Sequence, residues 1–285
     1  MNTRERLQQY AYLMRLDKPI GILLLLWPTL WALWLAARGM PNQTILFVFV
    51  SGVVLMRSAG CAINDFADRH VDGFVARTKT RPLAAKKLTA FEACVLAGVL
   101  MLCVFLLVLL CNAFTIKLAF VGALLAIIYP FLKRVTHLPQ FGLGLAFAFS
   151  VPMAFAAVTN QVSASAWFLF AASALWPVMY DTIYAMVDRD DDVRVGIKST
   201  AILFGQWDVM LIAAMQIIML MMFCIVGVLF SLNHLYYLSL VMVGMLFIYQ
   251  LWLVKDRDRE RCFRAFLNNN YVGMLIFSGI IVGLL

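Results

Sequence analysis

Charge is scarce in this 285-residue chain. Only 13% of its residues are charged and 64% are hydrophobic, whereas an average soluble domain is about 25% charged and about 45–50% apolar. One aqueous core cannot hide so much apolar surface, so the composition predicts an integral membrane protein. Apolar runs fill the chain from end to end, and we therefore expect a single membrane domain over residues 1–285, without a soluble appendage.

Residues that commonly bind zinc or take part in redox chemistry are also few and scattered. The six cysteines form no C-x-x-C pair, and the three histidines are spread along the chain. We therefore expect buried thiols that behave as small hydrophobes and no His/Cys metal site. The opening segment MNTRERLQQYAYLMRLDKPIG has basic residues but no short apolar region with a small-residue cleavage site, so we do not expect it to be a signal peptide.

Long apolar runs define the architecture. About 20 apolar residues form a helix that crosses the hydrocarbon core of a bilayer. The sequence predicts an all-α protein, and nine segments meet this measure: 20–38, 44–64, 90–111, 114–132, 139–158, 166–187, 209–231, 235–254 and 268–285.

Positive charge alternates between the two sides of these expected spans. Basic residues fill the N-terminal segment, the connection after the fourth span, and the loops 64–90, 188–208 and 255–267. The opposite side has only Arg38 and Lys117. Cytoplasmic loops carry an excess of Lys and Arg, so we expect the N-terminus and the basic loops in the cytoplasm and the C-terminus outside. This distribution explains the net charge of +8 without a nucleic-acid partner.

Acidic residues are rarer, and more than half of the fifteen fall within 65–72 and 181–192. Both windows lie at the expected cytoplasmic end of a span. In the first, NDFADRHVD spaces Asn64, Asp68 and Asp72 at i, i+4 and i+8, which is one face of a helix. Like charges at this spacing repel each other. The pattern therefore predicts a cation between these side chains, and oxygen-only ligands favour Mg²⁺ over Zn²⁺.

The second window repeats this arrangement. In YDTIYAMVDRDDD, Asp181, Tyr184, Asp188 and Asp192 also share one helical face. Asp181 lies about two turns inside its span, where an ionised carboxylate costs about 2.5–3.5 kcal/mol on insertion scales. A carboxylate at this depth is a functional-site candidate.

Basic side chains accompany both acidic windows. Arg57 lies inside the second expected span, where an arginine needs a partner or an anion. The basic candidates are Arg57, Arg77, Arg81, Lys133, Arg134 and Lys198. Each alone is typical of the positive side of a membrane protein. Together with Mg²⁺ they predict a bound diphosphate, because guanidinium groups and magnesium both bind phosphate oxygens. A site at the ends of spans could also receive a hydrocarbon tail from the bilayer, and an isoprenyl diphosphate has both parts.

Other classes of protein share some of these features. A cation transporter or channel could use the acidic faces as a path, although charges gathered at one membrane face argue against a path across it. A CDP-alcohol phosphotransferase is echoed in DRHVDGFVAR, but the spacing of its D-x-x-D pattern fails between Asp68 and Asp72.

The motifs NDFADRHVD and DRDDD resemble those of the UbiA superfamily of membrane prenyltransferases. The stretches LDKPIGILLLLWPTLWALWLA, RTKTRPLAA, YPFLKRVTHLPQ and YDTIYAMVDRDDDVRVGIKSTAILFG extend the similarity over about residues 12–275 and resemble the branch that acts in ubiquinone biosynthesis. The resemblance implies a bundle of nine transmembrane helices in the bacterial inner membrane, around a central cavity open to the cytoplasmic side and the bilayer.

The resemblance also implies a reaction. This is the Mg²⁺-dependent transfer of a polyprenyl group from polyprenyl diphosphate to the ring carbon of 4-hydroxybenzoate meta to its carboxylate. The implied metal ligands are Asn64, Asp68, Asp72, Asp188 and Asp192. The implied diphosphate-binding residues are Arg77, Arg81, Lys133 and Lys198. Haem O synthase and the menaquinone-pathway enzymes of the same superfamily remain alternatives.

The chemistry of the acceptor suggests further roles. A phenol attacks best when a base polarises or removes its proton, and we expect Asp181 to be that base. The acceptor carboxylate needs a cation, for which we choose Arg134, at the end of a span, ahead of Arg57. Aromatic faces can stabilise a developing carbocation. The candidates for this role are Tyr129, Tyr180, Tyr184 and Phe149.

Overall fold

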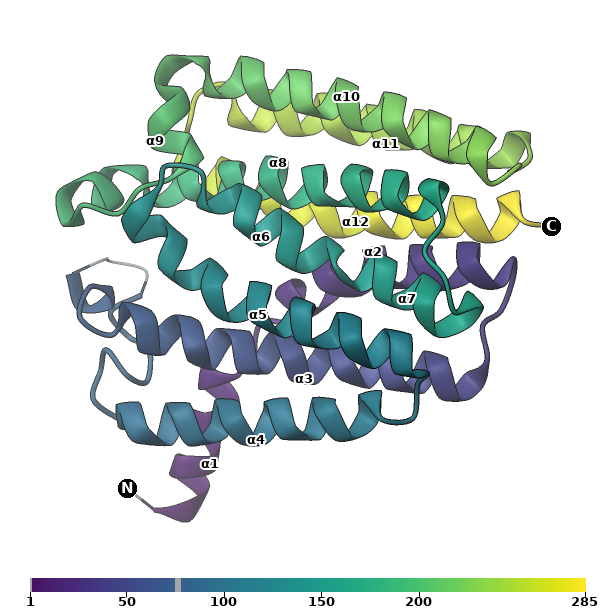
Figure 1. The fold of residues 1–285 in the computed structure, drawn as a ribbon. Helices are drawn as coiled ribbons and strands as arrows, with labels where there is room; N and C mark the ends of the chain where they lie inside the picture. Colours follow the sequence, from purple (N-terminus) through teal and green to yellow (C-terminus); the bar gives the residue numbers. More distant parts are fainter. Residues whose placement is uncertain (1, 75–77) are drawn as a thin grey trace.

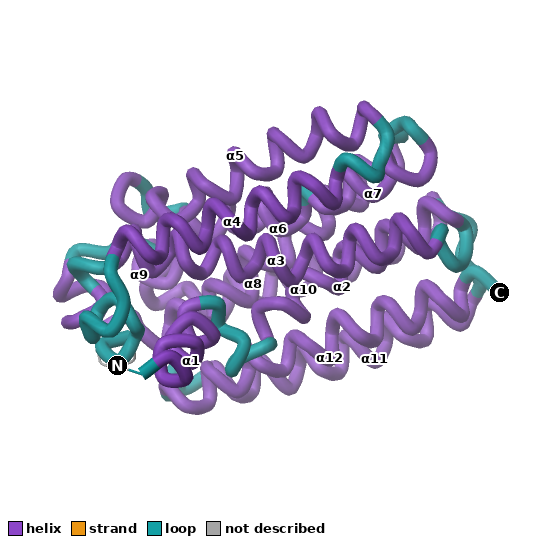
Figure 2. The backbone as a smooth tube through the Cα atoms, turned by 90° about the horizontal axis from the view of Figure 1, so that it is seen from below, coloured by secondary structure: helices purple, strands orange, loops and turns teal. Residues whose placement is uncertain are grey.

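The computed structural model describes residues 2–74 and 78–285, and the regular elements in these ranges are all helices (Figure 1, Figure 2). The all-α prediction is confirmed. In chain order the elements are α1 (Thr3–Leu13), α2 (Ile20–Ala37), α3 (Gln43–Asp68), the short 3-10 helix η1 (Asp72–Phe74), α4 (Ala90–Val108), α5 (Ala113–Val135), α6 (Pro139–Ala148), α7 (Ser150–Thr159), α8 (Ala164–Val195), α9 (Thr200–Phe204), the 3-10 helix η2 (Gly205–Trp207), α10 (Asp208–Leu229), α11 (His234–Val254) and α12 (Arg259–Gly283).

The long helices run side by side, and α1 lies across one end of the bundle (Figure 1). The connections that follow α3, α5, α8 and α11 meet at this same end, whereas the chain finishes at the other end. We call the first of these the basic end, because the connections there carry Lys and Arg side chains: Arg69, Arg81, Lys86 and Lys87 after α3, Lys198 after α8, and Lys255 and Arg257 after α11. The alternation of charge along the sequence thus corresponds to two physical ends of one bundle.

In the part of the chain that the structure describes, eight helical segments are long and apolar enough to cross a membrane. They are Ile20–Ala37, Gln43–Asp68, Ala90–Val108, Ala113–Val135, Pro139–Thr159, Thr200–Leu229, His234–Val254 and Arg259–Gly283. The protein is therefore a multi-pass membrane protein. The remaining expected span, 166–187, lies within α8, whose 32 residues extend over about 48 Å. Because α8 is not among the helices apolar enough to cross a membrane, the count of nine spans stays a prediction.

Two boundaries differ from the sequence-based prediction. The segment 139–158 is two helices, α6 and α7, which meet at Phe149. Pro152 explains the break, because its ring clashes with the carbonyl four residues earlier in a continuous helix. The last helix, α12, starts at Arg259 instead of residue 268. The side chain of Asp258 caps it by accepting a hydrogen bond of 2.9 Å from the Arg261 amide.

Helix α12 is bound to three neighbouring helices by three consecutive asparagines. Successive helical residues are rotated by about 100°, so adjacent side chains reach different neighbours. The Oδ1 atoms of Asn268, Asn269 and Asn270 accept hydrogen bonds from Gln250 of α11 at 2.9 Å, Trp176 of α8 at 3.1 Å and Trp27 of α2 at 2.9 Å. Polar side chains inside a membrane bundle join helices in this way. They fix α8, which lines the candidate site, against the rest of the bundle.

Helices α6 and α8 approach each other at Gly144. A Cβ atom on Gly144 would lie 2.3 Å from the backbone oxygen of Ala174. We expect Gly144→Ala to lower the unfolding temperature of the purified protein in detergent, with a cost of about 1–3 kcal/mol for overpacking. Gly98→Ala is the matched control, because an added Cβ there meets nothing within 4 Å. Equal unfolding temperatures for both variants would contradict this close packing.

Candidate active site

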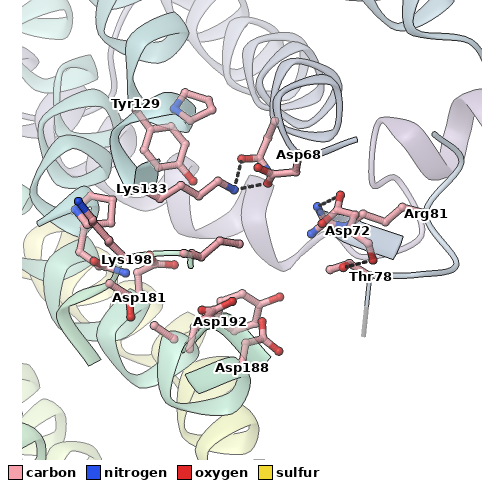
Figure 3. A pocket seen from close by; sticks show the side chains of 18 residues that line it. Asp68, Asp72, Thr78, Arg81, Tyr129, Lys133, Asp181, Asp188, Asp192 and Lys198 are labelled. Carbon is pink, nitrogen blue, oxygen red and sulfur yellow. Dashed lines mark hydrogen bonds and ion pairs between the residues drawn. The ribbon is translucent and has the colours of Figure 1, made fainter. Parts of the chain in front are cut away.

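Most of the expected site residues converge on one cavity of about 150 Å³ at the basic end (Figure 3). The ends of α3, α5 and α8 form its walls, together with the start of α6 and the segments that follow η1 and α8. Among the predicted residues, the cavity is lined by Asn64, Asp68, Asp72, Arg81, Tyr129, Lys133, Asp181, Tyr184, Asp188, Asp192 and Lys198. Sequence reasoning missed the lining residues Thr78, Pro130, Pro139, Gln140, Ala185, Ile197 and Ser199.

The first acidic motif is less regular than predicted. Helix α3 ends at Asp68, and Asp72 begins η1 after a turn, so Asn64, Asp68 and Asp72 do not lie on one continuous helix. The side chain of Arg69 donates a hydrogen bond of 2.7 Å to the Phe66 carbonyl, which satisfies an acceptor at the helix end. All three oxygen-bearing side chains nevertheless line the cavity.

Basic side chains pair with both carboxylates of this motif (Figure 3). Lys133 of α5 forms an ion pair with Asp68, and its Nζ lies 3.4 Å from Asn64 Oδ1. Arg81 Nη1 lies 2.8 Å from Asp72 Oδ2. Burial raises the pKa of Asp72, and the nearby Arg81 guanidinium opposes part of this effect. The two basic groups therefore serve as counter-ions for carboxylates that face the cavity.

The second acidic motif has the geometry that its spacing predicts. Helix α8 continues without interruption to Val195, so Asp181, Tyr184, Asp188 and Asp192 all face the cavity. In Figure 3 the three aspartates lie across the cavity from Asp68 and Asp72. The two motifs therefore oppose each other over a shared space.

Asp65 is a buried member of the first motif that the sequence-based site omits. Its side chain is 1% exposed and lies 3.0 Å from Arg15 and 3.2 Å from Arg81. Arg81 thus lies between Asp65 and Asp72, and Arg15 connects the N-terminal segment to the site. The sequence signal that could have identified Asp65 was its position directly after Asn64 in NDFAD.

The segments that follow α5 and α8 are held together by hydrogen bonds. The Lys198 amide donates to the Lys133 carbonyl at 3.0 Å, and Lys198 Nζ donates to the Val135 carbonyl at 3.2 Å. Gln140 Oε1 accepts a hydrogen bond of 3.0 Å from the Thr200 amide. These contacts set the two lysines beside each other on one wall.

Four of the predicted residues do not line the cavity, and Arg77 lies outside the described residues. Phe149, where α6 meets α7, packs edge-on against Phe170. Arg134 is half-exposed, donates to the Ala67 carbonyl and lies 3.9 Å from Asp68. Tyr180 is buried, with its ring 5.3 Å from that of Trp176. Arg57 lies deeper in α3.

Among the described residues, the contacts of Arg57 are to a thiol and an aromatic ring and include no carboxylate. Its Nη1 donates a 2.9 Å hydrogen bond to Cys61 Sγ, and its guanidinium lies 5.9 Å from the centre of the Phe147 ring. Its Nε is buried without a hydrogen-bond partner in the described parts of the chain. The guanidinium of Arg57 also lies near the phenols of Tyr129 and Tyr180. Arg57 therefore lies behind the cavity, close to its aromatic wall.

The donor atoms fit magnesium better than zinc. Within residues 2–74 and 78–285, no three His, Cys, Asp or Glu side chains form a ready-made metal cluster. Magnesium is usually held by one or two carboxylates and completes its shell with substrate phosphates and water. Carboxylates on two opposite walls and the amide oxygen of Asn64 would suit a divalent cation that is bound together with an anionic substrate.

The fold and this site define a class: a helical membrane protein with two opposed acidic motifs and basic side chains around one cavity. The model of the UbiA prenyltransferase family matches residues 25–277, and the chain belongs to this family. A curated relative from Psychromonas ingrahamii, 4-hydroxybenzoate octaprenyltransferase, is 54% identical over 99% of this chain and 98% of its own length. A relative of the same name from Tolumonas auensis is 57% identical over 96% of both chains.

Solved structures share the fold. The apo structure of a UbiA homologue from Aeropyrum pernix superposes with a TM-score of 0.81 at 26% identity and covers 93% of this chain and 98% of its own. A UbiA homologue from Archaeoglobus fulgidus bound to GPP and Mg²⁺ gives a TM-score of 0.73 at 12% identity, over 96% of this chain and 99% of its own.

Proposed function

We propose that this protein transfers a polyprenyl group from polyprenyl diphosphate to 4-hydroxybenzoate. The product is 3-polyprenyl-4-hydroxybenzoate, an intermediate of ubiquinone biosynthesis, and the reaction depends on Mg²⁺. The observation that carries this proposal is the identity of 54–57%, over nearly the whole chain, to relatives named 4-hydroxybenzoate octaprenyltransferase. The opposed acidic motifs with their basic partners support the diphosphate part of the substrate.

The proposed setting is the bacterial inner membrane, with residues 1–285 forming one domain of nine spans. The basic end and the N-terminus face the cytoplasm, as the excess of Lys and Arg at that end favours. The proposed cavity opens to this side and to the bilayer, so that the polar head of a lipid substrate can reach the acidic motifs while its tail stays in an apolar environment.

The two acidic motifs are the proposed metal ligands. Asn64, Asp68 and Asp72 would hold Mg²⁺ from one wall, and Asp188 and Asp192 from the other. When bound, Mg²⁺ neutralises the diphosphate and stabilises it as a leaving group.

The basic residues are proposed to exchange partners. Lys133 and Arg81 now bind Asp68 and Asp72, and in the substrate complex they would bind diphosphate oxygens together with Lys198 and Arg77. Guanidinium and ammonium groups bind phosphate oxygens strongly. The same side chains then neutralise the carboxylates before substrate binds and the leaving group afterwards.

The ring of the acceptor is proposed to lie between Asp181 and the aromatic wall. Asp181 would accept the proton of the phenol or polarise it, while Tyr129 and Tyr184, with Tyr180 behind them, offer faces to the allylic centre. The allylic C–O bond breaks, a bond forms to the ring carbon beside the hydroxyl, and that carbon then loses its proton. Diphosphate departs with the electron pair of the broken bond.

The surroundings of the two arginines favour Arg57 over Arg134 as the partner that we propose for the acceptor carboxylate. Arg134 is half-exposed outside the cavity, donates a hydrogen bond to the Ala67 carbonyl and lies 3.9 Å from Asp68. Arg57 is close to the phenols of the aromatic wall and has an unused Nε. A cation inside a membrane bundle needs an anionic partner, so we propose that Arg57 binds the carboxylate.

The direct test uses purified protein with geranyl diphosphate and 4-hydroxybenzoate. We expect prenylated product with Mg²⁺ and, because the diphosphate then lacks its counter-charge, none above background with EDTA. Chromatography of the product measures both. Failure of the wild type with prenyl donors of several lengths would contradict the proposal. Acceptors of the haem O and menaquinone pathways would then be tested, followed by a liposome assay for cation transport.

A further inference from the structure

A second ionic cluster lies on the side of α8 that faces away from the cavity. Its centre is Asp208, the first residue of α10, which is fully buried. The Asp208 carboxylate pairs with Arg189 of α8 and with Arg257 of the connection between α11 and α12. We call Arg189, Asp208 and Arg257 the brace.

Both carboxylate oxygens of Asp208 accept hydrogen bonds within the described structure. Arg257 Nε lies 3.1 Å from both carboxylate oxygens and its Nη2 lies 2.8 Å from Oδ1. The same Nη2 donates to the Gln206 carbonyl at 2.9 Å, and the Val209 amide donates to Asp208 Oδ1 at 2.6 Å. Such forked contacts of arginine fix orientation as well as distance. The brace therefore joins α8, α10 and the start of α12.

The brace acts on the turn of α8 that carries the second acidic motif. Arg189 directly follows Asp188 and is rotated from it by about 100°, so one residue faces the cavity and the next faces the brace. A further arginine strengthens the same connection: Arg259 lies 3.0 Å from Asp190 and 3.4 Å from Asp191. These ion pairs, on the side of α8 opposite the cavity, fix the rotation of this turn about the helix axis.

This end of α8 needs external support. Four carboxylates crowd its last turns, at Asp188, Asp190, Asp191 and Asp192, and the C-terminal end of a helix already carries partial negative charge. Like charges at i, i+4, such as Asp188 and Asp192, destabilise a helix. The positive charges of the brace, held in place by Asp208, oppose this repulsion.

We propose that Asp208 is a positioning residue: through Arg189 it fixes the rotation of the last turns of α8, so that Asp188 and Asp192 face the cavity. This inference rests on the proposed function for its consequence, which is tight binding of a prenyl diphosphate with Mg²⁺. The proposed role does not require Asp208 to contact substrate, and Asp208 does not line the cavity.

The test compares Asp208→Asn with Asp256→Asn. Asp256 belongs to the same connection as Arg257, but it is 56% exposed and pairs with Arg261 at 2.6 Å, away from α8. Hydrogen exchange is measured for residues 186–196 and, as an internal reference, for residues 58–68 of α3. We expect faster exchange at 186–196 in Asp208→Asn alone, with 58–68 unchanged.

Binding supplies the second readout. The affinity for the unreactive thiolo analogue of geranyl diphosphate, measured by titration calorimetry with Mg²⁺, should fall about 10- to 100-fold in Asp208→Asn, as for other residues that orient metal ligands. Asp208→Glu should recover part of the loss, and the KM for 4-hydroxybenzoate should stay within about threefold, because the acceptor contacts do not involve the brace. A merely structural role would shift both substrates equally.

The outcomes separate the two proposals. Unchanged exchange and unchanged affinity in Asp208→Asn would overturn the brace. If Asp208→Asn does not fold, hydrogen exchange and affinity are measured for Arg189→Gln instead. Unchanged exchange and unchanged affinity in that variant would also overturn the proposal. Local exchange that rises at 186–196 in a protein whose wild type forms no product would support the brace and contradict the proposed function.

Discussion

The variants Asp68→Ala and Asp188→Ala should each lower kcat/KM for Mg²⁺-dependent prenylation by about 100- to 1,000-fold. This is the range seen when one group that stabilises developing charge is removed. The two residues lie on opposite walls of one cavity. Each variant removes one proposed metal ligand from one wall and leaves the ligands of the opposite wall intact. Product formation with geranyl diphosphate and 4-hydroxybenzoate, measured over a range of Mg²⁺ concentrations, checks both variants.

The control for this pair is Asp17→Ala. Asp17 is an exposed aspartate in the connection that leads into α2, and it does not line the cavity. Its removal should leave the rate within about twofold, because exposed charges interact weakly. If only Asp68→Ala or only Asp188→Ala lost activity, the two motifs would not act together on one diphosphate.

Replacing Arg57 by alanine should raise the KM for 4-hydroxybenzoate by about 30-fold or more, since a buried charge pair that loses one partner costs about 2–5 kcal/mol. The KM for geranyl diphosphate should change little, because Arg57 does not line the diphosphate cavity. Initial rates with each substrate varied in turn separate the two constants. The apolar replacement inside a membrane span should not prevent folding.

Arg134→Ala is the matched comparison, because it removes the same charge from the end of α5. Its guanidinium is bonded to the Ala67 carbonyl and is half-exposed, so the KM for 4-hydroxybenzoate should change by less than about threefold. A large rise for Arg134→Ala with none for Arg57→Ala would restore the assignment made from sequence position alone.

The hydrophobic pattern predicted the helices well where the residues of a span are uniformly apolar. Eight of the nine expected spans coincide with helices apolar enough to cross a membrane. The pattern failed at local features that hydropathy does not detect. Pro152 divides the segment 139–158 into two helices, and the Asp258 cap starts α12 among charged residues.

The spacing of the acidic residues predicted one motif better than the other. The second motif keeps its helical face because α8 continues to Val195, whereas α3 ends at Asp68 and brings Asp72 to the cavity through η1. Spacing gives a face only while the helix continues. Arg134 shows a similar limit, since its position at the end of a span did not reveal that it points to a backbone carbonyl.

The sequence by itself determined that this is a helical membrane protein with its polar chemistry at one end. Composition, span length and the clustering of rare charges are local quantities, and each has a direct physical meaning in a bilayer. Only the tertiary structure decided which charges meet. It paired Lys133 with Asp68 and Arg81 with Asp72, and it connected α8 to α10 through Asp208. Such pairs join residues far apart in the chain, and their partners are set by how the helices pack and rotate.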